Sequence, residues 1–175
     1  MVQYIILLRG INVAGKNLLK MSAFKEALLA AGFLRVSTYI QSGNIVLSSS
    51  ATKEKSKRSI HKILERDFQI ETPLFMRSKT QWQSLFERNP WPDLLEGKRL
   101  YVAFVDRKTQ PEDALLLAPL ASNGDRFFLS GHEIFLDLES AGRTKLTTNN
   151  IDKKIGATST ARNLRTIMKL SAMLD

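Results

Sequence analysis

The chain has 175 residues, of which 43% are hydrophobic and 25% are charged, and this composition excludes an intrinsically disordered protein. It contains no cysteine, so disulfide bonds, thiolate nucleophiles and cysteine-ligated metals are excluded. The longest apolar run near the start covers only residues 4–8, which is too short for the core of a signal peptide or for a membrane span. We therefore predict a cytoplasmic protein without a membrane partner.

Charge is distributed unevenly along this basic chain, whose net charge is +9. Residues 1–80 contain 13 Lys and Arg against 5 Asp and Glu, residues 81–140 contain 6 against 10, and residues 141–175 contain 7 against 2. The basic ends favour an anionic partner there. The alternative explanation is that these residues only keep the protein soluble and pair with acidic residues of the same chain.

The first half of the chain predicts one β-α-β-β-α-β unit. Short apolar runs bounded by polar residues indicate strands, and apolar residues three or four positions apart indicate helices. Ser22 is a candidate N-cap of the first helix. The expected elements are a strand over 4–8, a glycine-containing loop over 9–19, a helix from about 21 to 31, strands over 36–40 and 45–47 joined by a tight turn at 42–44, a helix over 53–68 and a strand over 73–76. This order is the split βαβ pattern of a ferredoxin-like unit.

The second half repeats the order of elements without repeating the residues. A short helix around Trp82 leads into residues 89–93, where two prolines break the helix. The expected elements are strands over 100–105, 126–129, 133–138 and 157–161, helices over 111–120 and 148–155, and a final helix capped by Asn163.

The sequence therefore predicts an α+β fold with two ferredoxin-like (βαββαβ, α-β plait) lobes in one chain. Lobe one covers residues 1–78, a linking helix and proline-rich connection cover 79–98, and lobe two with the C-terminal helix covers 99–175. In the strands at 4–8 and 100–105, the side chains that point to either face of the sheet are apolar. A strand with one solvated face would instead alternate apolar and polar residues. We expect both their faces to be covered, by the other lobe or by a second copy in a homodimer.

Several motifs along the chain resemble those of a known family. They are RGINVAGKN at 9–17, GF at 32–33, TYIQSGN at 38–44, GRTKLT at 142–147, ARN at 161–163 and Thr166. Together they resemble the uncharacterised bacterial family called domain of unknown function 1697 over essentially the whole chain. The resemblance implies paired ferredoxin-like lobes and no established activity. Leu164 stands where the family usually has tryptophan and Arg165 where it usually has asparagine, so a ligand site that used this tryptophan would differ here.

The loop over residues 10–17 nearly matches a phosphate-binding P-loop. That motif requires a Ser or Thr hydroxyl for magnesium, and Asn17 stands in its place. The next helix starts several residues beyond Lys16, so its N-terminus does not point at a phosphate there. We therefore reject NTP hydrolysis and retain the simpler hypothesis of an anion site. Its candidate ligand-binding residues are Arg9, Asn12, Lys16, Asn17, Ser42 and Asn44.

The alternative for this loop is purely structural, because Gly and Asn are common turn residues. We expect the end of the first strand to lie near the far end of the third strand, so the sequence does not establish that the loop lies beside the turn at 42–44. A second candidate anion site consists of residues that precede two helix starts, where cations and helix N-termini favour anions. Its residues are Arg143, Lys145, Arg162 and Asn163, and plain capping is the alternative.

The helix over 53–68 carries four cations at spacings of three and four, which aligns them in one stripe. Such a stripe could follow the phosphates of a nucleic acid, and a solvated helix face is the alternative. These candidate nucleic-acid residues are Lys55, Arg58, Lys62 and Arg66.

No catalytic constellation is identifiable in the sequence. The two histidines, His61 and His132, have no second metal ligand beside them, so we predict no metal and no cofactor. Three hypotheses follow. The first is a non-catalytic binding protein that holds a phosphorylated small molecule or a nucleic acid with basic loops. The second is an enzyme acting on an anionic small substrate, although no general base is evident. The third is an assembly protein.

Overall fold

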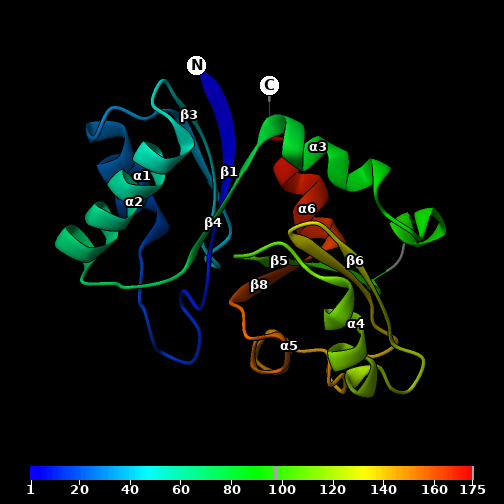
Figure 1. Cartoon of the computed structure of the whole chain (residues 1–175). Helices are drawn as coiled ribbons and strands as arrows, with labels where there is room; N and C mark the ends of the chain where they lie inside the picture. Colours follow the sequence, from blue (N-terminus) through cyan, green and yellow to red (C-terminus); the bar gives the residue numbers. More distant parts are fainter. Residues whose placement is uncertain (97, 175) are drawn as a thin grey trace. The chain divides into compact units, whose positions relative to one another are not determined.

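The structure is a computed structural model that describes residues 1–96 and 98–174 (Figure 1). Residues 97 and 175, which the predicted connection and lobe two include, lie outside the described residues. The chain forms two compact units. The first unit comprises Met1–Ser84 and the residues from Lys169 onward, and the second unit comprises Leu85–Met168. The predicted lobe two includes the whole C-terminal helix, whereas the residues from Lys169 onward belong to the first unit.

The first unit has the predicted βαββαβ order. Its elements are β1 (Val2–Leu8), α1 (Met21–Ala30), β2 (Leu34–Tyr39), β3 (Asn44–Ser49), α2 (Lys53–Phe68) and β4 (Leu74–Ser78). The strands form one antiparallel sheet in the order β2-β3-β1-β4, which confirms a ferredoxin-like fold. The prediction of Ser22 as an N-cap is wrong, because α1 begins at Met21 and has no side-chain cap.

Helices α1 and α2 pack together against one face of the first sheet (Figure 1). The spacing of three and four between their apolar residues directs Phe24, Leu28, Ile60 and Leu64 into one core with alternate residues of β1. The other alternating set of β1, which includes Ile5, is buried as well. Both faces of this strand are therefore covered, as its unbroken apolar sequence predicts.

The second unit repeats this architecture. Helix α3 (Lys79–Glu87) leads from the first unit into it, and the remaining elements are η1 (Pro92–Glu96), β5 (Leu100–Val105), α4 (Pro111–Leu117), η2 (Ala118–Leu120), β6 (Arg126–Ser130), β7 (Glu133–Asp137), α5 (Thr148–Ile155), β8 (Ser159–Asn163) and α6 (Leu164–Ser171). The sheet is antiparallel in the order β6-β7-β5-β8. Both units are thus ferredoxin-like, and the predicted α+β fold is confirmed.

Two elements of the second unit differ from their predicted bounds by more than one residue. The helix expected over 111–120 ends at Leu117 and tightens into η2, because Pro119 lacks the N–H that would continue the α-helical bonding. Strand β8 starts at Ser159 and runs two residues further than expected. Among the described residues, no helix is long and apolar enough to cross a membrane.

A buried carboxylate holds the start of the second sheet together. Asp137 at the end of β7 is fully buried, and it accepts hydrogen bonds from Arg99 (Nε, 2.8 Å) and Arg126 (Nη2, 2.6 Å). The Arg126 guanidinium also lies over the Trp91 ring, 4.9 Å from its centroid. This network uses three of the charges in the second unit internally.

We expect Asp137→Ala to lower the free energy of unfolding by about 3 kcal/mol, because it removes the acceptor of four charge-assisted bonds from two guanidinium groups. The matched control is Glu139→Ala, which removes a partner of Arg99 whose side chain is 54% exposed and which should cost under about 1 kcal/mol. Urea unfolding followed by circular dichroism measures both values. Equal effects of the two substitutions would contradict this assignment.

Candidate functional site

The loop that follows β1 lies beside the turn that precedes β3. Antiparallel pairing places Leu7 opposite Asn44, and the Leu8 N–H donates to the carbonyl of Gly43 at 2.8 Å. The expectation that the end of β1 lies near the far end of β3 is therefore wrong. The end of one antiparallel strand necessarily lies beside the start of its partner.

The side chain of Asn12 joins this loop to the turn. Its Nδ2 donates to the carbonyls of Leu19 at 2.9 Å and Gln41 at 2.7 Å, and its Oδ1 accepts from the Leu19 N–H at 2.8 Å. Both amide hydrogens and the amide oxygen are thus engaged with the backbone. Asn12 acts as a structural link between the two segments.

Residues 12–17 form a small hairpin, which we call the basic hairpin. The Asn12 N–H donates to the Asn17 carbonyl at 3.1 Å, and the Lys16 N–H donates to the Val13 carbonyl at 2.9 Å. Ala14 and the following glycine both have positive φ, +48° and +74°, as a two-residue type I′ turn requires. The Lys16 side chain is exposed, and no protein group pairs with its ammonium among residues 1–96 and 98–174.

The base of the basic hairpin is also held by its neighbours. The Arg9 N–H donates to the Pro73 carbonyl at 3.1 Å, and the Arg9 carbonyl accepts from the Thr72 hydroxyl at 2.5 Å. The Asn17 Nδ2 donates to the carbonyl of Gly10 at 3.2 Å. Sequence reasoning missed Thr72, because a threonine before a proline between two elements has no distinctive pattern.

The turn residues have different environments. Asn44 is fully buried, and its Nδ2 donates to the Tyr39 carbonyl at 3.1 Å and to the Ser42 hydroxyl at 2.9 Å. Asn44 therefore stabilises the turn itself. All six candidates from this region lie at one end of the first sheet, and Lys16 is its exposed cation.

The candidates of the second unit have different partners from one another. Arg143 and Lys145 are exposed and precede α5, which Thr147 caps by accepting from the Asn150 N–H at 3.3 Å. Asn163 caps α6, since its Oδ1 accepts from the Thr166 N–H at 2.9 Å.

Arg162 lies on β8 with neutral hydrogen-bond acceptors beside it. Its Nη1 donates to the Thr160 hydroxyl at 2.9 Å and to the Ala161 carbonyl at 2.8 Å. Burial lowers the pKa of Arg162 to about 10, so its guanidinium remains charged at neutral pH.

The predicted cationic stripe on α2 is exposed along its whole length. Arg66 differs from the others, because its guanidinium donates to both oxygens of Asp67 at 2.5 and 2.7 Å. A groove of about 330 Å³ lies between α1 and α2, with Lys62 and Arg66 on its wall and alanines of α1 opposite. Burial lowers the pKa of His61 on the same helix, so its imidazole adds no charge at neutral pH.

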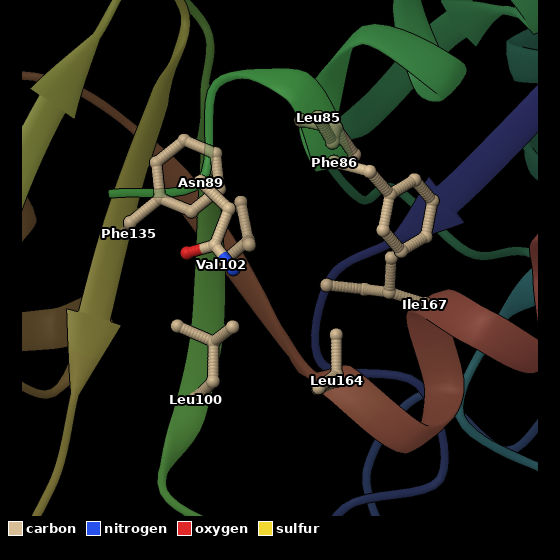
Figure 2. A pocket seen from close by; sticks show the side chains of 8 residues that line it. All are labelled: Leu85, Phe86, Asn89, Leu100, Val102, Phe135, Leu164 and Ile167. Atoms are coloured by element: carbon tan, nitrogen blue, oxygen red, sulfur yellow. The ribbon is translucent and has the colours of Figure 1, made fainter. Parts of the chain in front are cut away.

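Leu164, where the resembled family usually has tryptophan, lies in an apolar core and not at an open site. Figure 2 shows it with Ile167 of α6 facing Leu100 and Val102 of β5, and Leu85 of α3 belongs to the same lining. The space among these side chains is only about 10 Å³, which is room for one water molecule at most.

Comparisons with known proteins agree with this architecture. A family model described as "Protein of unknown function (DUF1697)" matches residues 1–135. The chain belongs to this family. No curated protein matches the chain. A solved structure of the conserved bacterial protein SP0830 from Streptococcus pneumoniae is similar to it, with a TM-score of 0.77 and 21% sequence identity over 99% of this chain and 98% of that one. The family membership confirms the resemblance for the motifs that lie within residues 1–135, and the structural similarity concerns the fold alone.

We expect Gly43→Ala to destabilise the first unit by about 3 kcal/mol. Gly43 has φ +74°, and an added Cβ would lie 2.7 Å from the Cβ of Leu8, so conformational strain and overpacking combine. Gly15→Ala is a matched control with the same φ and no atom within 4 Å of the new Cβ, and it should cost about 1 kcal/mol. Thermal unfolding compares the two variants, and a Gly43→Ala protein as stable as Gly15→Ala would refute the close packing.

Proposed function

We propose that this protein is a non-catalytic binding protein for a phosphorylated small molecule, which it holds at the basic hairpin. The observation that supports this proposal is an exposed, unpaired lysine on a hairpin whose backbone is held at several points. Lys16 supplies a compact positive charge for a phosphate oxygen. A loop that is already ordered loses little conformational entropy when it binds.

The charge around the hairpin supports the same proposal. The segment 1–80 carries 13 basic and 5 acidic residues, so an anion approaching this unit meets a favourable potential. Arg9 at the base of the hairpin and the amide of Asn17 are the further candidate contacts.

A non-catalytic role fits the absence of a general base from the basic hairpin and the neighbouring turn. The loop 9–19 and the turn 40–44 contain no Asp, Glu or His, so neither segment supplies a carboxylate or imidazole base. Among the described residues, no group of three His, Cys, Asp or Glu could hold a metal ion. An enzyme acting on an anionic small substrate is the alternative, and it would require a base from another segment.

A nucleic acid bound along α2 is a second candidate, supported by the exposure of its cationic stripe beside the groove between the helices. Lys55, Arg58 and Lys62 have no protein partner among the described residues, which leaves three cations for phosphates.

A thermal-shift screen tests the first candidate. We expect a phosphorylated metabolite at 100 times its dissociation constant to stabilise the protein by about 2.7 kcal/mol, which raises the melting temperature by about 5 to 10 °C. The shift should disappear in Lys16→Ala and remain in Lys153→Ala, which removes the same charge from an exposed position on α5. The site would be contradicted if no metabolite raised the melting temperature of the wild type or of Lys153→Ala. It would also be contradicted if a metabolite raised the melting temperature of Lys16→Ala as much as that of the wild type.

Filter binding of a single-stranded oligonucleotide at several salt concentrations tests the second candidate. Lys62→Ala should weaken binding and reduce the slope of log affinity against log salt by about 1, since one phosphate contact is lost. Arg66→Ala should have a smaller effect, because Asp67 already balances its charge. Binding that is absent at low salt, or equally sensitive to both substitutions, would exclude this use of the stripe.

A further inference from the structure

Strand β6 forms an outer edge of the second sheet and carries an exposed aromatic residue. It pairs only with β7 in the order β6-β7-β5-β8, and its register runs without interruption from Arg126 opposite Asp137 to Ser130 opposite Glu133. Phe128 at its centre is 45% exposed. A flat apolar edge strand is a template for pairing with another strand.

Strand β2, one of the two edge strands of the first sheet, is protected in ways that β6 is not. Strand β2 has a register shift between Leu34 and Ser37, and the exposed Arg35 within it has φ +51°. Bulges and outward charges are common devices against edge pairing. The one charged residue of β6, Arg126, is bonded to Asp137 and so does not serve this purpose.

The hairpin turn determines which backbone groups of β6 point outward. Only Gly131, with φ +66°, and His132 separate β6 from β7, and a two-residue loop makes Ser130 and Glu133 a hydrogen-bonded pair. Such pairs alternate along antiparallel strands. The N–H and C=O groups of Phe127 and Leu129 therefore point away from β7.

We propose that β6 pairs antiparallel with β6 of a second copy of this chain, about a two-fold axis that passes beside Phe128. The outward groups of Phe127 then meet those of the partner's Leu129, and the reverse pair forms by symmetry. Phe128 lies opposite the partner's Phe128 in a pair without mutual hydrogen bonds, where side chains approach most closely.

The strand is self-complementary in this register. Arg126 lies opposite the partner's Ser130, to which Arg88 of that copy donates, and both arginines are paired within their own chain, Arg126 with Asp137 and Arg88 with Glu133. The three central residues of both strands are apolar. Strand β6 can therefore pair antiparallel with β6 of a second copy over its whole length. Because only five residues of each strand take part, the contact is small, and we expect a weak, concentration-dependent dimer.

Cysteine cross-linking tests the register directly, because the chain has no cysteine of its own. Directly opposite residues without mutual hydrogen bonds have Cα atoms about 4.5 Å apart, within the range for a disulfide. Phe128→Cys should therefore give at least about ten times more disulfide-linked dimer under mild oxidation than Leu34→Cys, whose position is 48% exposed on the bulged β2. Equal cross-linking of the two variants would overturn the proposed pairing.

Sedimentation equilibrium provides a readout that needs no disulfide. The wild-type protein should shift from monomer to dimer between micromolar and submillimolar concentration, Phe128→Lys should stay monomeric, and Leu34→Lys should behave as the wild type. Circular dichroism shows that each variant is folded before it is compared. A wild-type chain that stays monomeric at submillimolar concentration, or a folded Phe128→Lys variant that dimerises equally, would overturn the proposal and leave a strand of another protein as the partner for this edge.

Discussion

The hydrogen bond from the Leu8 N–H to the carbonyl of Gly43 determines the architecture of the basic end of the first unit. It fixes the end of β1 against the turn before β3, and it requires a residue without a Cβ, since that atom would overlap Leu8. Asn12 can reach Gln41 only because this pairing has brought the two segments together. The exposed position of Lys16 depends on the same contact.

Acidic and basic residues have different roles in the two units. In the second unit, Asp137 binds Arg99 and Arg126, and Asp113 binds Arg107, whose hydrogen bond holds the pKa of that carboxyl below its usual range. These charges stabilise the fold. In the first unit, Lys16 and three cations of α2 have no such partner among the described residues, so they stay available to solvent and to an anion.

The fold could be predicted from the sequence because local patterns determine it. The apolar spacing in α2 and α5 fixed their boundaries to the residue, as capping by Thr52 and Thr147 and termination at Gly156 are local chemistry. Some wrong predictions have local causes, such as the early end of α4 before Pro119, and the others depend on tertiary contacts. The basic loop lies near the turn because β1 and β3 pair. Asn12 binds the carbonyl of Gln41, which is distant in sequence, and Asn44 binds the carbonyl of Tyr39 on the other side of the turn. No pattern of residue types indicates such contacts.

The last residues of the chain complete the unit with which the chain begins. The indole N–H of Trp82 donates to the Ser171 hydroxyl at 3.0 Å, and the residues from Lys169 onward belong with Met1–Ser84. During synthesis the first unit therefore cannot reach its final packing while the ribosome still holds this C-terminal segment. The second unit ends at Met168, directly before this segment, so both units depend on the same late stretch of chain for their completion.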